Sequence, residues 1–295
     1  MFDPAQLHAL RQVLRTGSFE RAAAALNVTP SAISQRIRAL EDQLGTILII
    51  RGQPALPTEA GARLARHAED VLLLEQGLAA DLGTNIAPGR PTLRLAVNAD
   101  SLATWVLPAL KALPDTLFDL VIDDQDHSAD WLRRGAVQAA VTAQGAAITG
   151  CDTHALGALR YSATASPEFI DKYFAEGVTA NALAHAPSLV FNQKDRLQSD
   201  WVRQITGQRV ELQSHFLGSS QGFVEAALQG LGWGMNPETL VADHLKAGRL
   251  RALQPDAPMD VMLHWQVNRL GAAAITPLTR AVKEAAARIL RPASV

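Results

Sequence analysis

Apolar residues recur at helical spacing from the start of the chain. The dipeptide Asp3-Pro4 is a typical helix start, because Asp is a good N-cap and Pro is tolerated in the first turn. Thr16-Gly17 then stops the pattern. The sequence therefore predicts a helix between these points, with an apolar stripe of Leu7, Leu10, Val13 and Leu14.

Two more helices are predicted in quick succession. Ser18 caps a short helix rich in small residues, Ala22 to Ala25, against which another helix can pack closely. Asn27-Val28 forms a short turn, and Thr29-Pro30 repeats the cap-and-proline signal. The third helix is expected to run to about Leu44, where Gly45 ends it.

The third helix has two chemically different faces. Two short helices joined by a tight turn are typical of a helix-turn-helix, whose second helix enters the major groove of DNA. Serine, glutamine and arginine form hydrogen bonds with bases and phosphates. A small helical bundle with a polar exterior explains three helices equally well. The apolar face holds Ala32, Ile33, Ile37, Leu40 and Leu44, and the polar face holds Ser31, Ser34, Gln35 and Arg38.

The segment that follows favours a winged helix-turn-helix. Residues 46–51 are expected to form a short strand, and residues 52–57 a turn with a second strand position. Arg51 at the base of this wing would reach a phosphate or the minor groove. A long amphipathic helix then runs from Thr58 to about Leu82. Because its apolar stripe needs a partner, we expect it to pair with a second subunit.

Beyond a loop at residues 83–91 the pattern changes to alternating strands and helices. Strands are predicted at 92–97, 117–122, 137–142, 187–191, 211–217, 231–235 and 262–267, and helices at about 102–110, 222–230 and 277–290. This alternation indicates parallel sheets with right-handed crossovers, in two α/β lobes joined near Tyr161 and Trp265. Ligands bind at the carboxyl ends of such strands, which here hold Asp100, Ser101, Asp123, Asp124 and Thr142.

Composition and charge support two regions of different character. The chain has 295 residues, 48% of them hydrophobic, and a net charge of −2. Residues 1–66 carry eight arginines against five acids, whereas every lysine and tryptophan lies beyond residue 100. A single cysteine, no apolar run of membrane-spanning length and no signal-like N-terminus predict a cytoplasmic protein.

No catalytic or metal site is predicted. The eight histidines are scattered without paired metal-ligand spacing, and Cys151 stands alone. The glycines at 230, 232 and 234 lack the strand-to-helix context of a nucleotide-binding motif. We therefore expect neither an enzyme nor a bound cofactor or metal.

The N-terminal region resembles the DNA-binding domain of LysR-type transcriptional regulators. The match covers Gly17-Ser18-Phe19, Arg21-Ala22-Ala23, residues 26–34, Ile37, Leu40-Glu41, Leu44-Gly45, Leu48, Arg51 and residues 58–61. Ile49 departs from it, because the family often has Phe there, and this should alter only the packing of the wing. The resemblance implies a periplasmic-binding-protein-like effector domain after the linker helix.

One branch of the family is similar over nearly the whole chain: the regulators that sense lysine and arginine and control export of basic amino acids. Its marks are residues 97–105, Asp124, residues 132–135, Gly222-Phe223, residues 230–234 and residues 237–239. The expected fold is thus α+β: a winged helix-turn-helix at 1–58, a linker and dimerisation helix with a hinge loop at 59–90, and an effector domain at 91–295. Its first lobe would take about 91–160 and 267–295, and its second about 161–266.

The expected site residues follow from these patterns and from the resemblance. Those for DNA are Ser18, Thr29, Pro30, Ser31, Ser34, Gln35, Arg38 and Arg51, and those for the effector are Asp100, Ser101, Thr104, Asp123, Asp124 and Thr142. Asp124 would bind an ammonium, and Asp100 would do likewise or cap its own helix. Ser101 would bind the carboxylate. The alternative for Asp123-Asp124 is a solvated turn.

The expected function is a DNA-binding regulator that senses lysine or arginine and controls an amino-acid exporter or metabolism gene. Its partners would be double-stranded DNA, the amino acid, RNA polymerase and further copies of itself, as a homodimer or homotetramer, without a membrane. The alternatives are a replication-origin or chromosomal DNA binder of the same fold, a regulator with another effector, and a solute-binding or transport protein. The wing and the lack of a signal sequence argue against the last.

Overall fold

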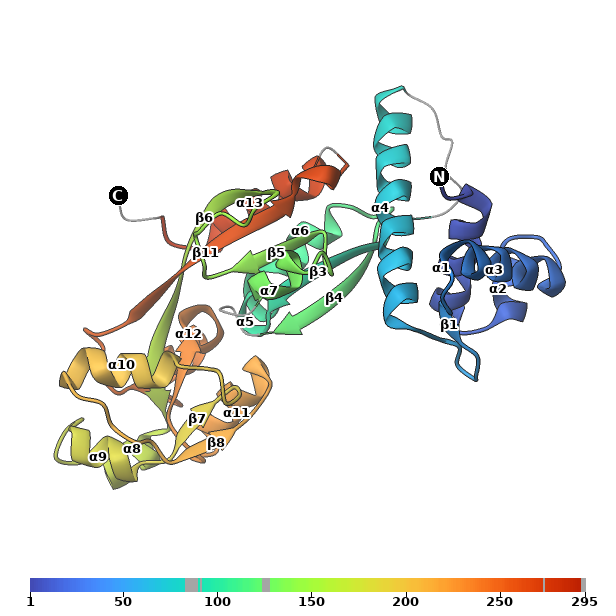
Figure 1. Cartoon of the computed structure of the whole chain (residues 1–295). Coiled ribbons are helices and arrows are strands. Elements are labelled where there is room, and N and C mark those ends of the chain that lie inside the picture. The colour runs from blue at the N-terminus through green and yellow to red at the C-terminus, as the bar shows by residue number, and fades with distance from the viewer. Residues whose placement is uncertain (83–89, 91, 124–127, 273, 293–295) are drawn as a thin grey trace. The chain divides into compact units, whose positions relative to one another are not determined.

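The computed structural model describes residues 1–82, 90, 92–123, 128–272 and 274–292. The chain divides into two compact units, Met1–Thr92 and Leu93–Val295. None of the helices in the described part of the chain combines the length and the apolarity that a bilayer crossing requires. Each unit is described by itself below (Figure 1).

The N-terminal unit is a winged helix-turn-helix followed by a long helix. The capping signals act as predicted, because the side chains of Asp3, Ser18 and Thr29 accept hydrogen bonds from Ala5, Arg21 and Ala32 backbone N–H groups. Its elements are α1 (Pro4–Thr16), α2 (Phe19–Ala25), α3 (Pro30–Leu44), β1 (Ile49–Ile50), β2 (Leu56–Pro57) and α4 (Glu59–Asp81).

The core of this unit lies among the first three helices and the first half of α4. The apolar face predicted for α3 is buried at Ile33, Ile37 and Leu40, and Leu10 of α1 packs against it. Leu64 of α4 joins the same cluster. Burying each such side chain stabilises the fold by about 1.5–3 kcal/mol, so this cluster holds the helices together.

The first wing strand is much shorter than the predicted 46–51. Only Ile49 and Ile50 pair, antiparallel, with Pro57 and Leu56. Side chains hold the approach to the strand instead of a partner strand. The carboxylate of Glu41 accepts the backbone N–H of Leu48 at 2.8 Å, and the Thr58 hydroxyl donates to the carbonyl of Ile47 at 2.8 Å.

The C-terminal unit is built on one seven-stranded sheet. Its elements are β3 (Thr92–Asn98), α5 (Ala99–Ser101), η1 (Leu102–Val106), α6 (Leu107–Lys111), β4 (Leu117–Asp123), α7 (Ser128–Arg133), β5 (Ala139–Thr142), β6 (Cys151–Ala165), α8 (Pro167–Tyr173), α9 (Ala180–His185), β7 (Ser188–Val190), α10 (Leu197–Thr206), β8 (Ser214–Phe216), α11 (Ser220–Leu228), β9 (Gly234–Pro237), α12 (Glu238–Lys246), β10 (Arg251–Ala252), β11 (Met259–Asn268), η2 (Arg269–Gly271) and α13 (Thr276–Ile289).

The sheet is mixed, so the prediction of parallel sheets is only partly right. Strands follow the order β10-β6-β11-β5-β3-β4, with β9 also paired to β6. β3 and β5 are parallel, whereas β11 runs antiparallel to both β5 and β6. The strand at 151–165 was not predicted. β7 and β8 form a separate parallel pair of three residues each, both shorter than predicted.

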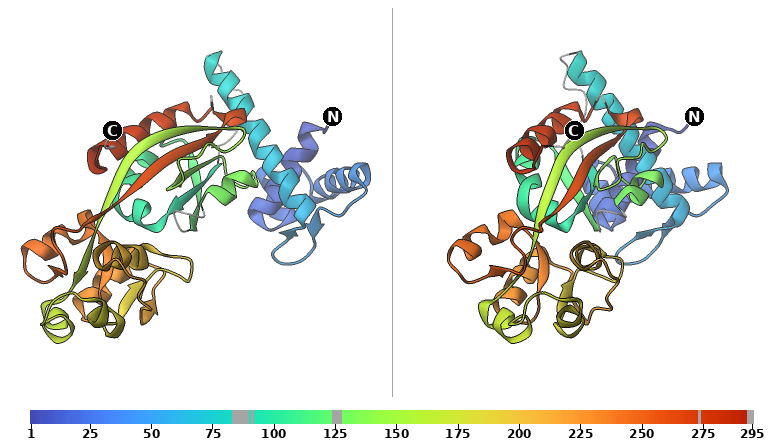
Figure 2. Two further views of the ribbon diagram at one scale, coloured as in Figure 1. Left: turned by 60° about the vertical axis from the view of Figure 1, so that its left-hand side comes forward. Right: turned by 90° about the vertical axis from the view of Figure 1, so that its left-hand side faces the viewer.

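Two long strands join two lobes. In Figures 1 and 2, β6 and β11 run from the first lobe, which contains β3, β4, β5 and α13, into the second, which contains α8 to α12. Tyr161 pairs with Met259 in the crossing, whereas Trp265 pairs with Val141 and His154 inside the first lobe. The domain and lobe limits given above remain predictions.

The crossing contains a glycine that its geometry requires. Gly157 has a φ of +123°, and a Cβ there would lie 2.5 Å from the carbonyl oxygen of Arg291. The register between β6 and β11 shifts close by, between Leu263 and His264. Next to it, Arg160 and Asp260 form a two-pronged ion pair at 2.7 and 2.6 Å. Hydrogen bonds from Arg160 hold the pKa of Asp260 below its usual value.

A test of the wing attachment follows from Gly61. A Cβ at Gly61 would lie 1.9 Å from the backbone oxygen of Leu48, whereas one at Gly45 meets nothing within 4 Å. Gly61→Ala should destabilise the N-terminal unit by about 3 kcal/mol, because backbone must move. Gly45→Ala, where φ is +64°, should cost roughly 1 kcal/mol.

Hydrogen exchange of amides in α3 and α4 measures both changes in the full chain. Equal losses of protection in the two variants would show that α4 is not held against the strand as the structure has it.

Candidate functional site

A polar groove in the N-terminal unit lies where the start of α3 meets the wing. Five of the residues predicted to bind DNA line it: Ser18, Pro30, Ser31, Ser34 and Arg51. The walls also include Gly17, Phe19, Glu20, Arg21, Gly52, Gln53 and Pro54. The fold thus gathers into one surface residues as far apart in the sequence as Gly17 and Pro54.

The other predicted DNA-binding residues lie on or beside the same helix. Thr29 is the N-cap of α3, where its side chain accepts the backbone N–H of Ala32 at 3.2 Å. Gln35 and Arg38 are exposed. Since residues four apart share a helix face, Ser31, Gln35 and Arg38 form a continuous polar strip opposite the buried side.

The wing holds its arginine beside the start of α2. The guanidinium of Arg51 lies 5.7 Å from the ring centre of Phe19, a cation–π distance. The backbone N–H of Ala55 donates to the carbonyl of Gly17 at 2.9 Å, which fastens the wing to the turn before α2. A positive side chain and a helix N-terminus together suit a phosphate backbone.

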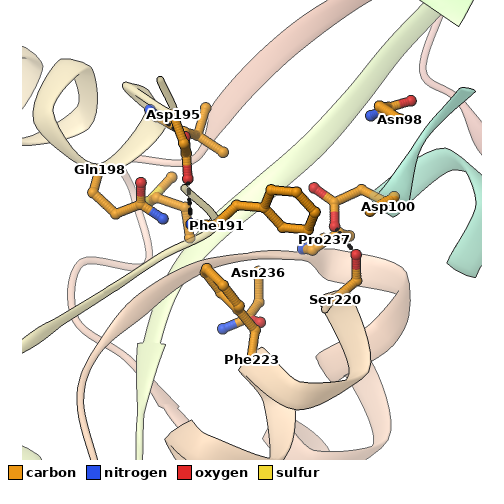
Figure 3. Close-up of a pocket in the computed structure, with 12 residues that line it drawn as sticks. Asn98, Asp100, Phe191, Asp195, Gln198, Ser220, Phe223, Asn236 and Pro237 are labelled. Atoms are coloured by element: carbon orange, nitrogen blue, oxygen red, sulfur yellow. Dashed lines mark hydrogen bonds between the residues drawn. The ribbon is translucent and has the colours of Figure 1, made fainter. Parts of the chain in front are cut away.

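The second candidate site is a pocket between the two lobes of the C-terminal unit (Figure 3). Its cavity has a volume of about 40 Å³. The first lobe supplies the end of β3 and the start of α5, and the second lobe supplies parts of α10, α11 and β9. It is lined by Asn98, Ala99, Asp100, Phe191, Asp195, Leu197, Gln198, Ser220, Phe223, Met235, Asn236 and Pro237.

Asp100 is the predicted effector residue that lines this pocket. Its carboxylate accepts a hydrogen bond from the hydroxyl of Ser220 at 2.5 Å and one from the hydroxyl of Tyr161 at 2.8 Å. Ser220 begins α11 of the second lobe, and Tyr161 lies on the crossing strand β6. The alternative role as a helix cap is wrong, because Asn98 is at the N-cap position of α5.

Three other predicted effector residues do not line the pocket. Ser101 is fully buried, and its hydroxyl has no hydrogen-bond partner among the described residues. The Thr104 hydroxyl donates to the backbone carbonyl of Asp100 at 2.6 Å, within the helical segment. Thr142 is buried in the sheet, where its hydroxyl donates to the carbonyl of Gln144 at 2.9 Å.

The two remaining acids come at the end of β4 and directly after it. Asp123 is the last residue of β4, at the carboxyl end of the strand as expected. Asp124 lies outside the described residues. Their assignment to the effector remains a prediction.

The second-lobe wall of the pocket was not predicted. Phe223 and Pro237 belong to segments that mark the resemblance, but neither was predicted as a site residue. Asn236 is fully buried, and its side-chain N–H group donates to the carbonyl of Gly234 at 3.3 Å and to Thr164 Oγ1 at 3.0 Å. A carbonyl only accepts, so these bonds fix the orientation of the amide.

That orientation leaves an acceptor in the pocket wall. Among the described residues, Oδ1 of Asn236 has no hydrogen-bond partner, and neither does Oε1 of Gln198. An unpaired buried acceptor costs about 1–3 kcal/mol. Both amide oxygens are almost fully buried, so the acceptor that the structure shows at the pocket is the Asp100 carboxylate.

Known proteins match both units. Residues 4–62 match the family described as "Bacterial regulatory helix-turn-helix protein, lysR family", and residues 87–287 match "LysR substrate binding domain". The regulator LysG of Mycobacterium tuberculosis is 43% identical over 289 residues, which cover 98% of this chain and 95% of that protein. It is named as a transcriptional regulator and not as an enzyme.

Solved structures agree over the whole length. The crystal structure of ArgP from Mycobacterium tuberculosis has a TM-score of 0.79 and 42% identity, and the match covers 99% of this chain and 100% of that one. Full-length LysG from Corynebacterium glutamicum, solved with bound effector Arg, has a TM-score of 0.66 and 38% identity, covering 98% and 100%. With both domains matched in order, this chain is a member of the LysR family of helix-turn-helix transcriptional regulators.

Proposed function

We propose that this regulator senses a basic amino acid, lysine or arginine, and controls a gene for amino-acid export or metabolism. The observation that carries the proposal is the carboxylate of Asp100 in a pocket lined by both lobes. The relatives support it, since one is named for lysine export and one structure contains Arg.

The charge of the pocket favours a cation. A basic amino acid brings ammonium or guanidinium donors, and a half-buried carboxylate binds these through charge-assisted hydrogen bonds. Asp100 contacts the effector directly in this proposal, and Thr104 acts by holding the Asp100 backbone. Asp123 and Asp124 remain candidates for a second ammonium contact.

The same contacts give a route to regulation. Asp100 belongs to the first lobe, and the hydroxyl that donates to it at 2.5 Å belongs to Ser220 of the second lobe. An effector cation that competes for this carboxylate binds the two lobe arrangements with different affinity. Such a difference is what a ligand needs to shift a conformational equilibrium.

DNA recognition is assigned to α3 and the wing. Ser31, Ser34, Gln35 and Arg38 read bases or phosphates from the polar face of α3, and Arg51 contacts the backbone. Ser18, Thr29 and Pro30 shape the two helix starts that face the groove.

A second copy of the chain is the proposed partner of α4. Leu74, Leu78 and Leu82 follow one another at four-residue spacing and are 49%, 61% and 63% exposed. An exposed apolar stripe of this kind pairs with a like helix. The resulting homodimer or tetramer would present two or more DNA-binding units to spaced sites and contact RNA polymerase in the cytoplasm.

Two arginine substitutions test the DNA interface in different ways. Arg38→Ala should weaken operator binding and relax specificity at one position, by about 1–3 kcal/mol. Arg51→Ala should weaken binding to all sequences alike and make the salt slope shallower by about one.

Fluorescence anisotropy with operator and scrambled duplexes at several salt concentrations measures both effects. Arg203→Ala, which removes an exposed charge from α10 of the other unit, is the control. Binding by either variant that equals the control would remove that arginine from the interface.

Asp100→Asn tests the effector contact. The substitution keeps the shape but removes the charge, so lysine and arginine affinity should fall about 10- to 100-fold by calorimetry. Basal DNA binding should stay unchanged. Asp243→Asn, at an exposed position on α12, removes the same charge and should have no effect. Unchanged affinity in Asp100→Asn would exclude this carboxylate from the site.

The function as a whole is tested by a thermal-shift screen of the amino acids, followed by footprinting with each ligand that binds. We expect lysine or arginine to raise the melting temperature and to alter the footprint. A footprint that no bound amino acid changes would instead favour the chromosomal DNA binder.

A further inference from the structure

The segment after α13 returns to the strands that cross between the lobes. Leu290 is buried, and Arg291 exchanges two backbone hydrogen bonds of 2.9 Å with Ala158 of β6. Because α13 belongs to the first lobe (Figure 1), this attachment brings the Arg291 side chain from that lobe to the level of the crossing. Nothing in the sequence patterns singled out this residue.

The side chain of Arg291 contacts the second lobe at this level. Its guanidinium donates to Oε2 of Glu238 at 3.1 Å, and Glu238 is the first residue of α12. The other carboxylate oxygen, Oε1, accepts the hydroxyl of Ser162 on β6 at 3.2 Å. Since both oxygens of Glu238 are held, the ion pair has a defined geometry.

Two further charges of opposite sign lie close to this pair. Arg160 of β6 and Asp260 of β11 form the two-pronged ion pair described above. Hydrogen bonds from Arg160 lower the pKa of Asp260 most strongly, and the positive charge of Arg291 also lowers it. The negative charge of Glu238 acts on Arg160 in turn. The four side chains thus form one network, and ion pairs at partly exposed positions contribute most in such networks.

The backbone links this ion pair directly to the wall of the pocket. Pro237 lines the cavity, and Glu238 is the next residue along the chain. The cavity of about 40 Å³ is far below the roughly 300 Å³ at which small-molecule sites begin. A bound amino acid therefore needs another arrangement of the walls, which both lobes supply.

We propose that the Glu238–Arg291 ion pair is a latch between the lobes, which favours the arrangement with the small cavity over the one that binds the effector. This inference rests on the proposed function and adds a pair of residues that sets effector affinity without touching the ligand. Because the partners belong to different lobes, a rearrangement that enlarges the cavity separates them. The free energy of the pair is then part of the cost of effector binding.

Removing either charge should therefore tighten effector binding. Glu238→Gln and Arg291→Gln should each raise the affinity for lysine or arginine about two- to fivefold, the range expected for a partly exposed ion pair. Calorimetry on the full-length protein measures this change. The double variant should gain no more than a single one, because both substitutions remove the same contact.

Matched controls remove ion pairs whose partners belong to one lobe. Arg251→Gln removes a contact of 3.4 Å with Asp171 inside the second lobe, and Arg269→Gln removes one of 2.7 Å with Asp152 inside the first. Both variants should bind the amino acid like the wild type. Equal gains in these controls, or gains that add in the double variant, would show a general loosening and overturn the latch.

A measurement without effector separates this inference from the function on which it rests. Nitroxide labels at Lys246→Cys on α12 and Lys283→Cys on α13, both exposed, report the distance between the lobes by pulsed electron paramagnetic resonance. A Cys151→Ala background removes the native thiol, and dilution with unlabelled subunits restricts the signal to one chain. The distance distribution should shift or broaden in Glu238→Gln and stay as in the wild type in Arg251→Gln.

The two measurements give distinct outcomes. An effector affinity that is unchanged or lower in a folded Glu238→Gln variant would overturn the latch and leave the proposed function standing. A wild-type protein that binds neither lysine nor arginine would overturn the proposed function. The distances then decide on the ion pair, because unchanged distances in Glu238→Gln would show that it does not hold the lobes.

Discussion

The hydrogen bonds on the Asp100 carboxylate are the interaction on which the sensing half of the protein depends. Ser220 brings the start of α11 to it, and Tyr161 brings the crossing strand β6. One side chain of the first lobe is thereby tied to two elements that lie 61 and 120 residues further along the chain. The two lobes are thus linked at a carboxylate that lines the pocket between them.

Local backbone structure places that carboxylate. β3 ends at Asn98, and the chain turns at once into α5, so Asp100 stands in the first turn of a helix that faces the pocket. The helix then widens into a π-helical turn, η1, over Leu102–Val106. Single π-turns are frequent at functional sites. The bond from Thr104 to the Asp100 carbonyl holds the peptide in place at the start of this turn.

Sequence analysis predicted the helices whose ends are set by residues close by in the sequence. Capping side chains and the glycines at 17 and 45 act within a few residues, so the three helices and their polar face could be predicted. β6 could not, because alanine, glycine and a change of burial between lobes erase its alternation.

The pocket was predictable on one side only. Asp100 follows a strand end, which is a sequence signal. Asn236 and Gln198 line the pocket because of where β9 and α10 lie in space. No sequence spacing predicts that these two residues lie at the pocket. The pattern also gave no sign that Thr142 would turn into the sheet.

The connection between the lobes is a hydrogen-bonded ribbon and not a pair of loose loops. Met259 to Leu263 pair in register with Tyr161 to Gly157, and Arg291 exchanges two backbone hydrogen bonds with Ala158 at the same level. A change in the angle between the lobes must therefore twist β6 and β11 together, because hydrogen bonds join the two strands. The positive φ of Gly157 and the register shift between Leu263 and His264 interrupt the regular pairing at this level. A change in the angle between the lobes would therefore be carried through paired strands and not through a loose linker.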